Sequence, residues 1–524
     1  MLSQIACRLQ LPLIVVIAIS MQAVGVCHAK EPSVARPYFL FYITSLDRLL
    51  DDFEIVFESV GRADLSKSLE SRLKGVRNFS GIDHTKPLGM MSTWEEEERA
   101  DVVFLPIEEI DELLKTATFE IVGYHSAGPN RYEIERPGSP YHVLIRNGYA
   151  MFAEAVSTIQ ALRVTPEQLI REYKDRFEVG LVLDLKQIPQ VTKTRFVKGL
   201  RDQVEPWLQM QDDEEKETAN LRRTFGGIVL DLIERTILDM NSWTIGAHLD
   251  PDTHHFILEA TMEAVGNSPT AIALNRWSAH RSEFSALVSP GVPAGIAINL
   301  PLRGLVDQIV GRASGRNDKD SNLNAGMQLV GDALGQLTLI AALSGDDARA
   351  LNEALPELII KLEKSGRFLS VCENFDVHRG VILHSTVPRE FPESITYLVG
   401  SDPEIVVGQG KKIFWIGVGQ PDLVVEHLKD AIDQLEDPTV VRPGSPLVRA
   451  RFQAAQVPEL VGANLLTPNV NPEVTKAEFS KGNDGFSLIV EPIENGIRLR
   501  LEAEEGFVRL LGRDWITQIE NANR

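Results

Sequence analysis

Histidine and aspartate gather at one point of the sequence, between residues 248 and 255. The segment Asp250-Pro251-Asp252-Thr253 is flanked by His248 on one side and by His254 and His255 on the other. Imidazole and carboxylate groups are common ligands of transition metals, and in a hairpin with this four-residue turn His248 would lie opposite His255. The same residues are also ordinary turn formers. We therefore predict a solvated hairpin tip, with metal binding as the alternative.

Other chemical motifs are incomplete. Asp318-x-Asp320-x-Asn322 begins as a calcium-binding EF-hand loop does, but leucines stand where that loop requires its glycine and its glutamate. Gly417-Val418-Gly419 lacks the third glycine of a dinucleotide-binding turn. The motifs G-x-S-x-G, H-E-x-x-H, C-x-x-C and G-x-x-x-x-G-K-[ST] do not occur. The sequence therefore assigns no catalytic residue, no metal ligand and no cofactor.

The cysteines add little chemistry. Cys7 and Cys27 lie in the N-terminal segment, so Cys372 is the remaining thiol. It follows an alternating stretch, Phe368-Leu369-Ser370-Val371, which predicts a strand. We expect a buried, inert thiol there, although a catalytic cysteine with a distant histidine partner is the alternative.

The composition limits the partners. The chain of 524 residues carries 53 basic and 74 acidic side chains, which gives a formal net charge of −21 at pH 7. Nucleic-acid binding requires a dense set of cationic side chains, so this acidic chain is not expected to bind nucleic acid. Its 44% hydrophobic content is typical of a globular protein. We expect a protein partner or a small apolar ligand.

The N-terminus has the pattern of a secretory signal. Residues 1–29 contain Arg8 as their charged side chain and an apolar run from Leu11 to Val26. Cleavage is predicted between Ala29 and Lys30, which makes the protein periplasmic or secreted. An uncleaved anchor is the alternative, although the apolar run is shorter than the usual ~20-residue membrane span. The later apolar segment Met327–Leu343 is predicted to be an amphipathic core helix.

Self-similarity is the strongest organisational signal, and it predicts a strand, a helix, a hairpin and a closing helix in each unit. The units begin at residues 38–46, 177–188, 294–305 and 447–460. Asn147-Gly148 and Asn495-Gly496 are suited to two-residue type I′ hairpin turns, and a third hairpin is predicted about Gly408–Gly410. Helical spacing over Leu46–Val60, with Ser45 before it and Gly61 after it, predicts a capped helix.

These signals predict an α+β fold of mostly antiparallel sheets with helices on one face, arranged in two related halves. Residues 1–29 are the predicted signal peptide, residues 30–276 the first half, and residues 285–524 the second half, whose last unit is shortened. Related halves should share strand order and hairpin positions. The pattern over Arg36–Gly512 resembles large secreted or periplasmic bacterial proteins of unknown function, and this resemblance implies no activity.

The predicted fold suggests where binding would occur. A sheet covered by helices on one face leaves a second face, on which Phe39, Phe41, Ile296 and Ile298 are candidate residues. We predict a non-catalytic exported envelope protein that binds a partner or an apolar ligand on a sheet face or at the junction of the halves. The alternatives are an exported hydrolase with dispersed catalytic residues and a structural or scaffold component of the envelope.

Overall fold

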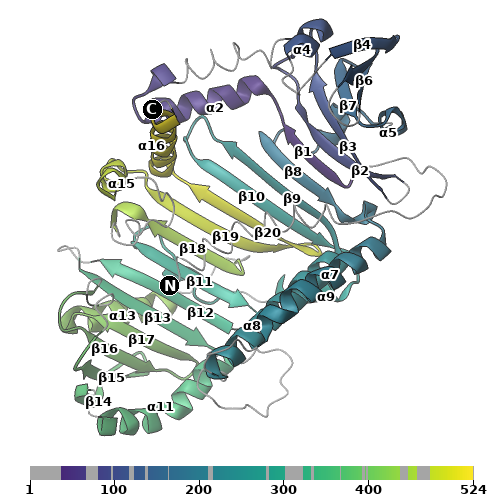
Figure 1. Cartoon of the computed structure of the whole chain (residues 1–524). Coiled ribbons are helices and arrows are strands. Elements are labelled where there is room, and N and C mark those ends of the chain that lie inside the picture. Colours follow the sequence, from purple (N-terminus) through teal and green to yellow (C-terminus); the bar gives the residue numbers. More distant parts are fainter. Residues whose placement is uncertain are drawn as a thin grey trace. The chain divides into compact units, whose positions relative to one another are not determined.

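The chain forms two compact units, the first made of residues 1–272 and 511–524 and the second of residues 273–510. The computed structural model describes residues 37–65, 81–95, 98–116, 123–135, 140–162, 164–209, 216–278, 282–300, 323–331, 336–365, 368–391, 396, 399–436, 446–456 and 472–522. Each unit combines helices with an antiparallel sheet (Figure 1).

The sheet of the first unit is antiparallel throughout. Its strands are β1 (Phe39–Ile43), β2 (Leu88–Glu95), β3 (Glu98–Pro106), β4 (Gly123–Gly128), β5 (Arg131–Glu135), β6 (Tyr141–Arg146), β7 (Tyr149–Ala153), β8 (Val179–Asp184), β9 (Met240–Leu249) and β10 (Phe256–Ala264). They pair in the order β10-β9-β8-β1-β2-β3-β7-β6-β5-β4 (Figure 1). The register shifts within β4, between Ser126 and Gly128.

The sheet of the second unit is built in the same way. Its strands are β11 (Ala294–Leu300), β12 (Leu323–Gly331), β13 (Leu337–Ser344), β14 (Phe368–His378), β15 (Val381–Pro388), β16 (Glu404–Gln409), β17 (Ile413–Gly419), β18 (Val448–Gln453), β19 (Gly485–Ile493) and β20 (Gly496–Ala503). They pair in the order β20-β19-β18-β11-β12-β13-β17-β16-β15-β14, and every pair is antiparallel. The register shifts twice within β14.

The two strand orders correspond position by position. A strand of the first unit holds the place in its sheet that the strand numbered ten higher holds in the second. The register also agrees next to the short 3-10 helices η1 (Leu185–Gln187) and η3 (Ala454–Gln456). Leu181, four residues before η1, pairs with Phe41 of β1, and Ala450, four residues before η3, pairs with Ile296 of β11.

The helices lie between and after these strands. In the first unit they include α2 (Leu46–Ser59), α4 (Ile110–Thr116), α5 (Val156–Ala161), α6 (Pro166–Ile170), α7 (Gln190–Leu208) and α8 (Lys216–Asp239), and α9 (Pro269–Ser278) follows β10. In the second unit they include α11 (Asp346–Ser365), α13 (Pro421–Glu436) and α15 (Pro472–Phe479), and α16 (Glu505–Ala522) follows β20. No described helix is long and apolar enough to cross a membrane.

The predicted first helix is confirmed as α2. The Ser45 hydroxyl caps it by accepting a hydrogen bond from the backbone N–H of Arg48 at 3.1 Å. Gly61, with φ of 73°, follows its end, where a side chain would strain the left-handed backbone. Val56 and Phe57 are buried from one side of this helix.

Helices pack on both faces of each sheet around β7 and β17, so the prediction of helices on one face is wrong there. In the first unit, Met151 packs with Ile159 after β7, whereas the next residue, Phe152, packs with Leu113 of α4. Successive strand residues point to opposite faces, so the helices flank the sheet on two sides. In the second unit, Trp415 packs against α13 and the preceding residue, Phe414, against α11.

Most hairpin predictions are confirmed, and one turn differs by a residue. Asn147-Gly148 joins β6 to β7 with positive φ at both residues, and β16 pairs with β17 beside Gly410. At β19–β20 the two loop residues are Glu494 and Asn495, one position earlier than predicted.

The prediction of a helix over Met327–Leu343 is wrong. The segment contributes to two antiparallel strands, β12 and β13, and its side chains alternate between the two faces of the sheet.

Candidate functional site

An apolar surface covers one face of four neighbouring strands in the first unit, β1, β8, β9 and β10. Three cross-strand rows form it, and we call it the first apolar face. The rows are Ile43–Val179–Ala247–Leu258, Phe41–Leu181–Ile245–Ala260 and Phe39–Leu183–Trp243–Met262. Phe41 and Ile245, in the middle row, keep 36% and 39% of their surface exposed. An apolar area of this extent is unusual on a solvated sheet.

The corresponding strands of the second unit, β11, β18, β19 and β20, carry the same kind of surface, the second apolar face. Its rows are Ile298–Val448–Val490–Leu499, Ile296–Ala450–Leu488–Leu501 and Ala294–Phe452–Phe486–Ala503. Most of these side chains are half-buried. The Phe486 ring packs at a tilt against the Phe507 ring, with ring centroids 5.6 Å apart, so one corner of this face is covered by the segment after β20.

The opposite face of these strands is buried core at β1, β8 and β11, through Leu40, Tyr42, Val182 and Ala297, and is more polar on β9, β10 and β18–β20. In the second unit it presents Arg449, Arg451, Ser487, Arg498 and Glu502 from β18, β19 and β20. In the first unit it presents residues such as Thr244 and Glu259. Alternation along β1 and β11 places the four sequence-predicted residues Phe39, Phe41, Ile296 and Ile298 on the apolar faces.

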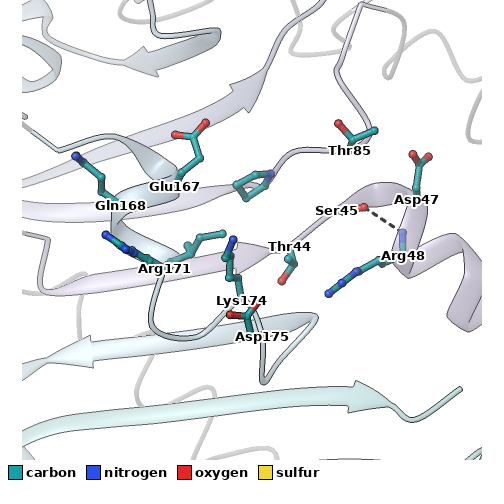
Figure 2. A pocket seen from close by; sticks show the side chains of 12 residues that line it. Thr44, Ser45, Asp47, Arg48, Thr85, Glu167, Gln168, Arg171, Lys174 and Asp175 are labelled. Carbon is teal, nitrogen blue, oxygen red and sulfur yellow. Dashed lines mark hydrogen bonds between the residues drawn. The ribbon is translucent and has the colours of Figure 1, made fainter. Parts of the chain in front are cut away.

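A polar pocket lies in the first unit, where β1 leads into α2. It has a volume of about 820 Å³ and is lined by Thr44, Ser45, Asp47, Arg48, Thr85, Pro87, Glu167, Gln168, Ile170, Arg171, Lys174 and Asp175 (Figure 2). Its walls come from the start of α2, the loop before β2, and α6 with the turn that follows it. Pairing of β1 with β2 and β8 brings these distant segments together.

The hydroxyl groups of the pocket are already engaged. Thr44 donates a hydrogen bond to the Phe177 carbonyl at 2.8 Å, and Thr85 donates to the Asp83 carboxylate at 2.6 Å. Ser45 accepts the capping hydrogen bond of α2. The nearest histidine contact, from His84 to Asp47 at 3.7 Å, involves a carboxylate and not a hydroxyl. A nucleophile activated by a base is therefore not assembled among the described lining residues.

A pair of carboxyl groups lies close to the pocket. Burial and the neighbouring Glu178 carboxyl raise the pKa of Asp52, on α2, to about 9. Glu178 also accepts a hydrogen bond from the backbone N–H of Leu249 at 3.1 Å. At neutral pH Asp52 is therefore protonated, and its hydrogen bond to the Glu178 carboxylate links α2 to the residue before β8.

The histidine and aspartate segment forms a hairpin tip. The loop spans Asp250–His255, and His248 pairs with Ile257, so the prediction that His248 faces His255 is wrong by two residues. The backbone N–H groups of Asp252 and Thr253 donate to the Asp250 carboxylate and lower its pKa. The described residues contain no group of three histidine, cysteine, aspartate or glutamate side chains placed to hold a metal ion.

The remaining predicted positions have mixed outcomes. Cys372 lies in a strand, β14, as expected, but its side chain is exposed and the predicted burial is wrong. Its strand is at one end of the sheet order, where fewer neighbours cover it. The predicted cleavage site at Ala29 and Lys30, and the incomplete calcium motif Asp318–Asn322, lie outside the described residues.

Comparison of the chain with protein-family models, curated proteins and solved structures found no match. The candidate surfaces therefore rest on their own geometry. Sequence reasoning missed the pocket, because its lining residues come from segments between 44 and 175 that no local motif connects. Alternating apolar residues on four strands were the signal for the apolar faces.

Proposed function

We propose that this chain is an exported, non-catalytic protein that binds an apolar ligand on the apolar faces of its sheets. The observation that carries the proposal is the middle row of the first apolar face, Phe41–Leu181–Ile245, in which two large side chains are partly exposed. Contiguous exposed apolar surface of this kind is typical of a ligand or partner site.

The shape of the surface favours an elongated ligand without hydrogen-bonding groups. The row from Ala260 through Phe41 continues into Met90 of β2, and the next residue in the row, Val103 of β3, packs into the core beside α4. Neighbouring strands are about 4.8 Å apart, so the five strands β10, β9, β8, β1 and β2 give a strip about 19 Å long. The strip carries no charged side chain, although the chain has a net charge of −21. A lipid-like chain fits a strip of this length and chemistry better than a polar protein surface does.

We also propose that the two units are copies of one ancestral unit. The shared strand order, the matching register beside η1 and η3, and the two apolar faces support this proposal. In a crystal structure, superposing β1–β10 on β11–β20 should bring Leu181 onto Ala450. If the two units superposed better with the strands matched in a different order, the proposed duplication would be contradicted. The four smaller repeat units stay a prediction.

Binding of a neutral apolar dye tests the ligand site. Nile red should show saturable binding to the full chain, and Phe41→Ser with Ile245→Ser should weaken it at least fivefold, because burial of a large apolar side chain contributes roughly 1.5–3 kcal/mol. Val191→Ser on α7 is the matched control, since Val191 is 67% exposed and lies outside the apolar faces. Equal losses in the control and the test variant would reject the proposed site.

Export is tested separately. After expression in a bacterial host, N-terminal sequencing of the protein from the periplasm or the medium should find Lys30 as the first residue. Recovery of the chain in the cytoplasm with residues 1–29 still attached would reject export and leave the ligand site unaffected.

A further inference from the structure

The pocket at the start of α2 is lined by three cationic side chains that form no ion pair with a described carboxylate, although the charge of Arg48 lowers the pKa of nearby Asp52 against the larger effect of burial. Arg48 comes from the first turn of α2, and Arg171 and Lys174 come from the turn after α6 (Figure 2). Within the described part of the chain, no ion pair joins any of the three to an acidic side chain. In the view of Figure 2 they reach toward the pocket from opposite walls.

Some cations of the same unit are paired, whereas these three, like Arg195 and Lys198 of α7, form no ion pair within the described residues; what sets the three apart is that they line one cavity. Arg62 pairs with Asp64 at 2.9 Å, Lys86 with Asp83 at 2.7 Å, and Arg201 with Glu234 at 2.7 Å. An acidic chain offers many carboxylates for such pairs. The cavity is also lined by the carboxylates of Asp47, Glu167 and Asp175, so its charges balance, but the three cationic groups are not tied to these carboxylates and can turn toward an anionic ligand.

The backbone of α2 does not provide the anion site. The N–H groups of Leu46 and Asp47 both donate to the His84 carbonyl, at 3.0 and 3.3 Å, and that of Arg48 donates to Ser45. The first-turn amides that often bind anions are thus used by the fold. A ligand would be held by side chains, and arginine forks are well suited to carboxylate and phosphate groups.

The pocket also carries groups for the rest of a ligand. Glu167, Gln168 and Asp175 line it beside the cations and offer acceptors for hydroxyl groups. The volume of about 820 Å³ is within the range of small-molecule sites and exceeds what a single inorganic ion would fill. Charged acceptors and donors in one cavity suit a molecule with several hydroxyl groups and an acidic group.

We propose that this pocket binds an anionic sugar, with Arg48, Arg171 and Lys174 holding its carboxylate or phosphate and Glu167 and Asp175 accepting hydrogen bonds from its hydroxyls. This site is independent of the apolar faces, because its lining residues belong to other segments. The chain would then bind a polar ligand in this pocket as well as an apolar ligand on its sheet faces. The pocket proposal does not depend on the apolar-ligand proposal.

Isothermal titration calorimetry of the full chain at low ionic strength tests the site. Glucuronate and glucose 6-phosphate serve as the carboxylate and phosphate probes, and glucose as the neutral control. At least one anionic probe should bind saturably, at least tenfold more tightly than glucose, and the tighter of the two identifies the acidic group. Failure of both probes to bind, or equal binding of glucose, would overturn the proposal.

Substitutions locate the binding. Arg171→Gln combined with Lys174→Gln should weaken the bound probe at least tenfold, and Arg48→Gln should weaken it by a similar factor. Arg195→Gln combined with Lys198→Gln removes the same charge from exposed positions of α7 and should change binding less than twofold. All substituted positions are exposed, so the variants are expected to fold, which circular dichroism checks. Equal weakening in the α7 variant would assign the effect to net charge and overturn the site.

Discussion

The two units place helices of very different length at the same point of the same strand order. After β17, the second unit has the 16-residue helix α13, which buries Val424, Leu428, Ala431 and Ile432 in the main core. After β7, the first unit has α5 and α6, of six and five residues, followed by a turn. A long helix fills the layer above the sheet, whereas two short helices leave the pocket. The same strand order can therefore support either a packed helix layer or a pocket. Which of the two forms depends on the length of the helix after β7 or β17.

The largest expected effect contrasts a buried cation of the second unit with an exposed one of the first. Arg509 is 6% exposed and donates hydrogen bonds to the carbonyls of Glu478 at 3.0 Å and Gly482 at 2.6 Å. Arg509→Met should lower the free energy of unfolding by about 3–5 kcal/mol, because it leaves two buried carbonyl groups without their donor and removes one of the cations beside the buried Glu478 carboxylate. Urea denaturation followed by fluorescence measures the loss.

The matched variant is Arg176→Met in the first unit. Arg176 pairs with Glu259, whose side chain is buried, but Arg176 itself is half exposed and water can replace it, so the expected loss is about 1–2 kcal/mol, smaller than for Arg509→Met. If this variant lost as much stability as Arg509→Met, the contrast between a buried and an exposed pair would be wrong.

A second prediction compares the two helix layers directly. Leu428→Ala in α13 should cost about 3 kcal/mol, because Leu428 is fully buried and its removal leaves a closed cavity. Ile170→Ala in α6 should cost about half as much, since Ile170 already borders the pocket and the space it vacates joins an existing opening. Equal losses in urea denaturation would show that α6 is packed as tightly as α13.

A third prediction concerns pH. The pKa of Asp52 is raised above its unfolded value, so the folded state holds this proton more tightly than the unfolded state does. The stabilising contribution is complete below about pH 4 and is lost as the pH rises to about 9, with a slope of at most about 1.4 kcal/mol per pH unit. Denaturation midpoints measured from pH 6 to pH 9 should fall for the native chain and fall less for Asp52→Asn.

The second unit supplies the control for this pH effect. Burial, and then Asp422, raise the pKa of Glu404, which accepts a hydrogen bond from Ser385. Glu404→Gln should reduce the pH dependence less than Asp52→Asn, because Asp422 acts on Glu404 through its charge alone, whereas Asp52 also shares a hydrogen bond with the Glu178 carboxyl. A larger effect at Glu404 would place the main titrating group in the second unit.

The sequence predicts where single helices and hairpins begin and end better than it predicts which face of the sheet each helix covers. Ser45 and Gly61 mark the ends of α2, and Asn147-Gly148 marks a hairpin, because these signals act within a few residues. The Met327–Leu343 segment misleads because its small and apolar residues suit a helix as well as a buried strand pair. The side of the sheet that α4 and α5 cover depends on strand order, which local patterns do not encode.

Of the candidate sites, the apolar faces could be predicted from the sequence and the pocket could not. Alternation along single strands already points to Phe41 and Ile296, and the structure extends each into a face of four strands. The pocket could not be predicted, since Arg48 and Lys174 are 126 positions apart in the sequence and meet only through the pairing of β1 with β8.

The irregular strands at one end of each sheet have a consequence for solubility. β4 and β14 both carry register shifts, and a bulged strand presents its backbone N–H and C=O groups at uneven spacing. A straight strand from another molecule cannot match that spacing along its whole length, so growth of the sheet by addition of further chains is discouraged there. The register shifts in β4 and β14 therefore oppose fibre formation at these two strands.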